Sequence, residues 1–503
     1  MKFEILDRWG DYPKNTKSQI FLTWDDWNDY SFFTLFGIFY VNERSEKIDL
    51  GGIKIGYFGQ IEKETRLSIG DKFTKIGQDF FTVGVDVVYY ERLNNLGDTV
   101  RDAILVGLND IALDSNLFKK AILEDVTKVS FLRYLSETTI TGQFRRLAKG
   151  GSKLTSYDFK FATLPSDKDI SALELSFSVI PESTPPTNIH ILIGRNGVGK
   201  TFLINSMIDS LTKPEKHQNG FFVSQIDYDS TIFANLVCVT FSAFDEFEHP
   251  PEKRDKTIEI QYSYIGLKSI GESKLVSQPK NPSQFAEEFV KSIFACINNS
   301  RIGIWKHAIK ILESDPIFKY SNIYNLVDSS NENEIKETAF NLFQQLSSGH
   351  KIVLLTITRL VETVQERSLV LFDEPESHLH PPLLASFIRA VSDLLINRNG
   401  VAIIATHSPV ILQEIPSSCV WKLRRNGTEA VAERLEIESF GENVGVLTHE
   451  VFGLEVTDSG FHKLLKDIVR NTESYENAIQ ILNNQVGLEA KAILRSLFFQ
   501  KNS

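Results

Sequence analysis

The chain has 503 residues, and its 65 Asp and Glu outnumber its 54 Lys and Arg, for a formal net charge of −11. With 42% hydrophobic and 24% charged residues, its composition is typical of a globular protein with a sizeable core, which excludes disorder, collagen-like repeats and a disulfide scaffold. At about 150 residues per domain, the length suggests two to four domains. The acidic balance argues against a protein that coats nucleic acid by bulk electrostatics.

Cysteine usage and hydropathy bear on the compartment. The three cysteines, Cys238, Cys296 and Cys419, are too far apart for a CxxC metal pair, and so sparse a set fits a reducing environment. The N-terminus lacks the apolar core of a signal peptide. The longest apolar run, residues 32–41, is far shorter than the ~20 residues that span a bilayer. We therefore expect a cytoplasmic protein without a membrane anchor.

Residues 1–150 mix strand and helix patterns and predict an α+β region. Residues 31–41 are dense in β-formers and indicate a buried strand. The run 48–58 is interrupted by a Gly-Gly pair, which suggests a hairpin. From 99 to 111 the apolar residues recur at helical spacing. A segment rich in Gly, Ser and Lys at 149–153 marks the expected boundary.

A different pattern begins at residue 151. Residues 189–193 form a short apolar strand, and the continuous apolar runs 369–372 and 401–405 are typical of central strands in a sheet that is covered on both faces. We predict an α/β domain over 151–425 that contains a helical insertion at about 250–345. The remaining residues, 426–503, are expected to form a mainly helical tail for oligomer or partner docking.

A glycine-rich loop follows the strand at 189–193. Its residues are Gly194, Arg195, Asn196, Gly197, Val198, Gly199, Lys200 and Thr201, which match G-x-x-x-x-G-K-[ST] in full. Such a loop turns backbone N–H groups toward phosphate oxygens, and the helix that follows adds its positive N-terminal dipole. Lys200 should reach the β- and γ-phosphates, and Thr201 should hold Mg²⁺. A chance glycine loop is the alternative, and the strand–loop–helix context disfavours it.

Two further strands end in candidate catalytic residues. The run 369–372 is followed by Asp373 and Glu374. A strand that ends in Asp places a carboxylate beside the phosphate loop to orient Mg²⁺, and Glu374 could act as general base toward water. His407 follows the strand at 401–405, at the sheet edge where α/β proteins bind ligands. A single histidine in a loop is usually a hydrogen-bonded polar residue without a catalytic role. The functional interpretation of His407 therefore depends on its position at this edge.

A small polar loop precedes a helical pattern that begins near residue 350. Its residues Ser347, Ser348 and Gly349 stand before the apolar positions of that helix. The free N–H groups of a helix N-terminus bind anions. From the residues alone, an ordinary serine N-cap is the favoured alternative.

The order of these motifs resembles ABC-class ATPases of the soluble SMC-, RecF- and OLD-like branch over about residues 170–425. This resemblance implies a P-loop NTPase domain of ABC type with ATP and Mg²⁺ as cofactors, in which Ser347, Ser348 and Gly349 bind ATP held by a second subunit. It also implies that Glu374 is the catalytic glutamate and His407 the switch histidine. Three features depart from the family pattern. Ser348 stands where glycine is usual and His350 where glutamine is common, no Q-loop glutamine is obvious after the strand at 236–241, and about 170 residues precede the ATPase core.

Residues 373–381 are similar to the Asp-Glu-Pro-Glu-x-x-Leu-His-Pro variant of this branch. His378 and His380 are therefore interpreted as part of a dimer-interface loop, with a metal pair as the alternative. The whole chain looks most like bacterial anti-phage ATPases of the PtuA (Septu) type, which assemble with an HNH nuclease. The residues after 410 contain no Asp-x-Asp and no His/Asn cluster, so no intrinsic nuclease is predicted.

These features predict an ATPase that acts as sensor or regulator of an anti-phage defence complex. Its expected partners are a second copy of the chain, an HNH-type nuclease in trans and nucleic acid through local contacts, with no membrane. The alternative is a DNA-repair or chromosome-maintenance ATPase that grips DNA itself, which salt-dependent duplex binding would distinguish. A transporter-coupled ABC subunit is disfavoured by the long N-terminal region and the insertion.

Overall fold

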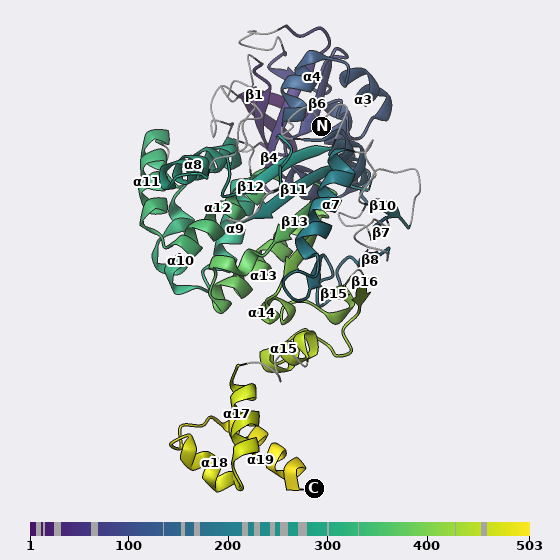
Figure 1. The fold of residues 1–503 in the computed structure, drawn as a ribbon. Coiled ribbons are helices and arrows are strands. Elements are labelled where there is room, and N and C mark those ends of the chain that lie inside the picture. The colour runs from purple at the N-terminus through teal and green to yellow at the C-terminus, as the bar shows by residue number, and fades with distance from the viewer. Residues whose placement is uncertain are drawn as a thin grey trace.

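The computed structural model places the N-terminal region at one end of the molecule, a large α/β unit in the middle and a small helical unit at the other end (Figure 1). The structure describes residues 1–6, 12–13, 16–24, 32–61, 69–133, 135–151, 156–164, 172–213, 220–225, 232–241, 247–251, 260–269, 279–298, 301–329, 331–427, 429–453 and 460–502.

The middle unit is built on a seven-stranded sheet. In spatial order its strands are β12 (Gln261–Gly266), β11 (Asn235–Thr240), β13 (Ser368–Asp373), β14 (Val401–Thr406), β9 (Ile189–Ile193), β15 (Val420–Asn426) and β16 (Glu429–Glu433). Neighbouring strands are parallel except for β16, which pairs antiparallel with β15. The carboxyl ends of the six parallel strands therefore share one edge, where the candidate site residues lie.

Both faces of this sheet are covered, and this explains the continuous apolar runs. On β13, Val370 and Phe372 face one core, and Leu369 and Leu371 face the other. The first core includes residues of α8 (Pro282–Asn298), α9 (Ile302–Leu312), α12 (Ser348–Thr363) and α13 (Pro381–Arg398). The second lies under α7 (Lys200–Thr212) and a sheet of order β10 (Phe221–Ser224), β7 (Tyr157–Ala162), β8 (Glu174–Val179). The predicted α/β P-loop class is confirmed.

The limits of the helical insertion and of the sheet differ from the prediction. The sequence predicts an insertion at about 250–345, but within this range β12 is a parallel strand that pairs with β11 along its whole length. The inserted helices are α8, α9, α10 (Pro316–Tyr320) and α11 (Glu332–Gln345). At the other limit, β16 extends the sheet beyond residue 425. Short strands at a sheet edge carry a weak sequence pattern, and their pairing partners define them.

The N-terminal region contains a sheet of order β5 (Lys72–Phe73), β1 (Lys2–Leu6), β2 (Gln19–Trp24), β3 (Leu35–Val41), β4 (Lys47–Tyr57), β6 (Phe80–Gly84). The predicted hairpin within 48–58 is wrong, since this run is the single strand β4. Gly51 lies at an irregularity in its pairing with β3, and its φ of +101° suits glycine.

Helices pack against this N-terminal sheet around a shared core. They are α1 (Val87–Asn95), α2 (Asp98–Gly107), α3 (Ser115–Ala121), α4 (Asp125–Val129) and α6 (Arg145–Ala148). The helix expected at 99–111 corresponds to α2.

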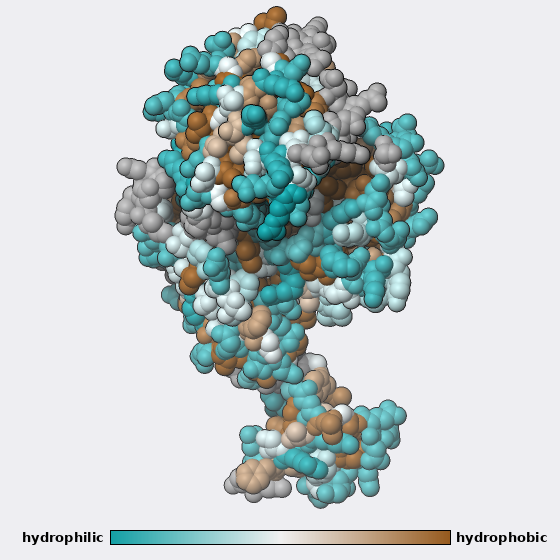
Figure 2. All heavy atoms as spheres, turned by 180° about the vertical axis from the view of Figure 1, so that it is seen from behind, coloured by the Kyte–Doolittle hydropathy of each residue, from teal (hydrophilic) through white to brown (hydrophobic). Residues whose placement is uncertain are grey.

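The C-terminal end forms a small lobe that is separate from the rest (Figures 1 and 2). After α15 (Val444–Phe452) come α17 (Gly460–Asn471), α18 (Tyr475–Ile481) and α19 (Leu488–Asn502), which share a core of their own. Leu488 and Phe499 are 87% and 76% exposed. Among the described helices, none is both long and apolar enough to cross a bilayer.

Candidate functional site

The phosphate loop joins β9 to α7 along a path that requires glycine. Gly197 and Gly199 have φ values of +83° and +104°, which only glycine adopts readily. A Cβ atom on Gly194 would lie 2.5 Å from the carbonyl oxygen of Leu423 on β15. The loop therefore lies directly against its neighbouring strand, with α7 beginning at Lys200.

Lys200 folds back over this loop. Its Nζ donates to the carbonyl oxygens of Gly194 and Arg195, both at 2.9 Å. Burial lowers the pKa of Lys200, while Glu374 and Asp373 act in the opposite direction. The ammonium group is thus held between the loop and the acidic strand end, where it is suited to bind phosphate.

Thr201 and Asp373 meet although they are far apart in the sequence. The Thr201 hydroxyl donates to Asp373 Oδ1 at 3.2 Å. Asp373 is the last residue of β13 and is only 5% exposed. Hydroxyl and carboxylate oxygens are the ligands that Mg²⁺ prefers, so this pair fits a magnesium site beside the loop.

Glu374 departs from strand geometry immediately after β13. Its φ and ψ are 49° and 56°, a left-handed conformation that costs a non-glycine residue free energy. Its N–H donates to the carbonyl oxygen of Ala405 on β14 at 2.9 Å. Strain of this kind is concentrated at functional sites, and here it turns the residue out of the β13 strand path.

His407 lies beside two carboxylates. Its Nδ1 is 3.6 Å from Glu374 Oε1 and 3.3 Å from Glu376 Oε1. Glu376 also accepts from the His407 N–H at 2.8 Å and from the Thr406 hydroxyl at 2.5 Å. Glu376 is a site residue that the sequence motifs did not single out. Its partners come from the next strand, β14, so no local pattern could have revealed this contact.

Ser347, Ser348 and Gly349 lie elsewhere, at the N-terminus of α12. Ser347 is the N-cap residue, but its hydroxyl makes no hydrogen bond that caps the helix. It contacts His350 Nδ1 at 2.6 Å instead. Within the described part of the chain, no hydrogen bond or ion pair joins these three residues to the phosphate loop. In a single chain, therefore, the phosphate loop meets the acidic strand end and His407 but not the serine-rich loop before α12.

Gly349 gives a first testable prediction. A Cβ atom at this position would lie 2.7 Å from the backbone carbonyl oxygen of His378. We expect Gly349→Ala to destabilise the protein by about 1–3 kcal/mol, because the backbone must shift to admit the methyl group. Chemical unfolding in urea measures this.

The matched control is Gly303→Ala in α9, where an added Cβ meets nothing within 4 Å. It should stabilise the helix by about 0.5–1 kcal/mol. Equal effects of the two substitutions would contradict the close packing of α12 on the loop at His378.

Two arginines lie at the β15–β16 end of the sheet. Arg434 stacks on the Trp421 ring, 3.7 Å from its centroid, and donates to the Ser176 carbonyl oxygen at 2.9 Å, so it anchors β8. Arg425 Nη1 would lie 3.6 Å from a Cβ atom on Gly199, which puts a second cation beside the phosphate loop. Residues 242–245, where a Q-loop glutamine would follow β11, lie outside the described residues.

A sequence-family profile and solved structures match parts of the chain. The profile, described as "AAA domain, putative AbiEii toxin, Type IV TA system", matches residues 241–413. An ATP-binding cassette of an ABC transporter in its ADP conformation covers 60% of this chain and 98% of its own, at 13% identity and a TM-score of 0.33. A metal-chelate type ABC transporter, 15% identical, covers 59% and 89% at a TM-score of 0.30. The fold assignment rests on the strand order and loop placement above.

A curated relative matches from end to end. Protein ea59 of Escherichia phage lambda is 41% identical over 524 aligned residues, which cover 100% of this chain and 99% of that protein. The phosphate loop and the acidic strand end sit in the α/β fold of a P-loop NTPase domain. The chain belongs to the family of phage lambda protein ea59.

Proposed function

We propose that the chain hydrolyses ATP between two copies of itself and uses the cycle to control a partner. The observation that carries this proposal is the meeting of Lys200, Thr201, Asp373, Glu374 and His407 at the carboxyl edge of the sheet. Cation, metal-ligating oxygens and a base in one place are the groups that phosphoryl transfer to water requires.

Each residue then has a distinct role. Loop N–H groups from 194–199 and Lys200 bind the phosphates, and Thr201 and Asp373 hold Mg²⁺. When bound, the ion neutralises charge on the phosphate oxygens. Glu374 accepts a proton from the attacking water. His407, beside Glu374 and Glu376, contacts the terminal phosphate and reports its presence.

The second copy supplies the remaining phosphate contacts. Ser347, Ser348 and Gly349 make no hydrogen bond to the phosphate loop of their own chain within the described residues. The open N-terminus of α12 suits an anion, and ATP held by the other copy is its proposed ligand. Closure would bury two ATP molecules and change the shape of the pair.

The proposal also extends to the partner that the ATPase cycle controls. By its resemblance to PtuA-type ATPases, the chain would be the sensor or regulator subunit of an anti-phage complex with an HNH-type nuclease acting in trans. The exposed apolar residues of the C-terminal lobe, such as Leu488 and Phe499, give a partner or second copy a surface to bind. A relative encoded by a phage is compatible with defence against competing phages.

Lys200→Ala tests the nucleotide assignment. We expect ATP affinity to fall at least tenfold, because the ammonium that faces the β- and γ-phosphates is lost. Binding of a fluorescent ATP analogue measures this. The matched control is Lys213→Ala at the opposite end of α7, where the side chain pairs with Asp209 at 2.7 Å. Normal ATP binding by Lys200→Ala would refute the nucleotide site.

Mass photometry with and without ATP tests the shared site. The proposal expects ATP to increase the population of dimers or larger assemblies. DNA cleavage that requires ATP, the chain and an added HNH-type nuclease together would support the regulatory role. Salt-dependent duplex binding by the isolated chain would favour a DNA-gripping ATPase instead.

A further inference from the structure

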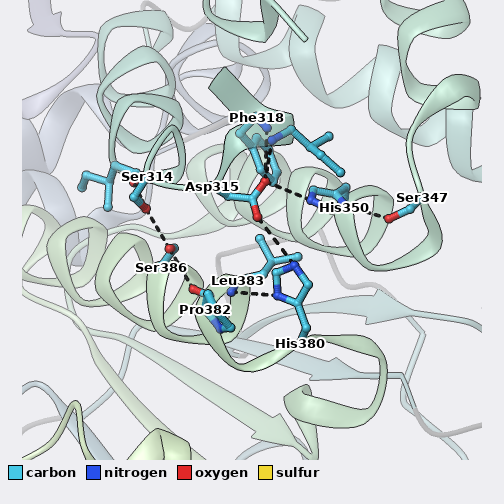
Figure 3. Close-up of polar contacts among 11 residues, drawn as sticks. Ser314, Asp315, Phe318, Ser347, His350, His380, Pro382, Leu383 and Ser386 are labelled. Carbon is cyan, nitrogen blue, oxygen red and sulfur yellow. Dashed lines mark hydrogen bonds and ion pairs between the residues drawn. The ribbon is translucent and has the colours of Figure 1, made fainter. Parts of the chain in front are cut away.

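Three side chains from different elements meet beside the N-terminus of α12 (Figure 3). His350 Nε2 lies 3.1 Å from Asp315 Oδ1, and His380 Nε2 lies 3.7 Å from Asp315 Oδ2. Asp315 precedes α10, His350 is in the first turn of α12 and His380 precedes α13. Asp315 and His350 are 5% and 4% exposed, so the central contact is buried.

Ser347 is the outer end of this chain of contacts. A serine at an N-cap normally accepts a hydrogen bond from the N–H of the second or third helical residue. Here its Oγ lies 2.6 Å from His350 Nδ1, and no side-chain cap bond forms. The hydroxyl is therefore fixed by His350, and the first N–H groups of α12 are not capped by it.

Asp315 anchors the inner end. Its Oδ1 accepts from the N–H groups of Ile317 and Phe318 at 2.8 and 3.3 Å, which caps α10. The same carboxylate faces both imidazole rings, and buried polar groups of this kind are strongly coupled when all are satisfied. The position of His350 thus follows the position of α10 in the inserted helices.

The contacts of His380 decide whether the cluster can bind a metal ion. The ligand atoms of Asp315, His350 and His380 all lie within 4.8 Å of one another, a spacing that a metal ion could use. However, His380 Nδ1 accepts from the Leu383 N–H at 3.1 Å. With Nδ1 as acceptor, a neutral ring carries its proton on Nε2, which faces Asp315 Oδ2 across 3.7 Å and has no lone pair left for a metal. The geometry favours an electrostatic contact of His380 with Asp315 over a metal site.

We infer that Asp315, His350 and His380 form a relay that holds the hydroxyl of Ser347 in place for the ATP bound by a second copy. This inference rests on the proposed function, because it assigns residues that prepare the trans half of the same site. Asp315 and His350 are positioning residues: they act on nucleotide only through Ser347.

The relay also connects the catalytic segment after β13 to the N-terminus of α12. His380 follows the segment that carries Glu374 and Glu376, and its ring reaches the carboxylate that orients His350. Gly349 packs against the backbone carbonyl of His378 in that same segment. A movement of the catalytic loop on ATP loss would therefore shift the relay and release Ser347 from the partner's nucleotide.

Four variants test the relay: Ser347→Ala, His350→Ala, the double variant and Asp315→Asn. We expect each single variant to lower kcat about tenfold, with affinity for a fluorescent ATP analogue unchanged, because the phosphate loop is untouched. The double variant should be no slower than Ser347→Ala, since His350 acts through the serine. Asp315→Asn keeps an oxygen to cap α10, so its melting temperature should stay near wild type.

His307→Ala is the matched control, because His307 Nε2 also pairs with an aspartate, Asp393, at 3.2 Å but on the exposed side of α9. It should leave kcat unchanged. Multiplied losses in the double variant, or wild-type kcat in His350→Ala, would overturn the relay. Stoichiometric zinc in the purified chain that His350→Ala loses would replace it by a metal site. Absence of ATP hydrolysis by the wild type would instead refute the proposed function.

Discussion

Glu374→Gln should slow ATP turnover by about 10²–10⁴-fold while leaving ATP affinity nearly unchanged. The amide keeps the shape of the side chain but cannot accept a proton from the attacking water. Glutamine is also no worse than glutamate in the left-handed conformation that residue 374 adopts. Binding should survive, because Lys200, Thr201 and Asp373 are untouched.

Phosphate release under single-turnover conditions measures the chemical step, and mass photometry shows whether the ATP-bound assembly accumulates. The matched control is Glu433→Gln on β16, which removes an exposed carboxylate 3.8 Å from Arg424. Turnover equal to wild type in Glu374→Gln would show that Glu374 is not the base. Glu376, which contacts the same histidine, would then be the next candidate.

The phosphate loop could be predicted from sequence because its information is local. Eight consecutive residues fix the positive-φ glycines, the helix start and the lysine, and the preceding apolar run fixes the strand. Asp373 and His407 followed from the same logic, since each ends a continuous apolar run. The carboxyl edge of a parallel sheet brings such strand ends together whatever the loops between them.

Contacts between distant segments could not be predicted in this way. Glu376 contacts Thr406 and His407 only because β13 and β14 are neighbours. Ser347 had the pattern of an ordinary N-cap, and only the position of Asp315 shows why its hydroxyl turns to His350. Likewise β12 is a strand because β11 lies beside it.

The contact between the N-terminal region and the ATPase unit was also hidden from the sequence. Asp86, which caps α1, lies 2.9 Å from the Arg398 guanidinium and 3.8 Å from Arg301 Nε. All three residues are at most 5% exposed. Burial alone would raise the pKa of Asp86, but Arg398 and Arg301 lower it below its ordinary value of 3.8. A buried carboxylate thus joins the start of α1 to the end of α13.

Asp86→Ala should destabilise the protein by about 3–5 kcal/mol, because it leaves two buried guanidinium groups without this counter-charge. Asp86→Asn keeps an oxygen that accepts from the Val88 N–H. It should therefore lower the free energy of unfolding by about 1 kcal/mol less than Asp86→Ala does, because the cap of α1 survives while the charge is lost. The midpoint of urea unfolding, followed by circular dichroism, measures both. Asp49→Ala is the matched control, since its 2.6 Å pair with Arg92 is exposed and should contribute under about 1 kcal/mol.

The pH dependence of this effect has a definite sign. A carboxylate whose folded pKa is lowered contributes stability above its ordinary pKa and loses it as pH falls through the folded pKa. For Asp86 that window lies below 3.8, so the cost of Asp86→Ala should be the same at pH 6 and pH 8. A cost no larger than that of Asp49→Ala would show that the buried pair adds little. A full cost would mean that Arg398, the last residue of α13, ties the N-terminal region to the helix that begins beside the catalytic loop.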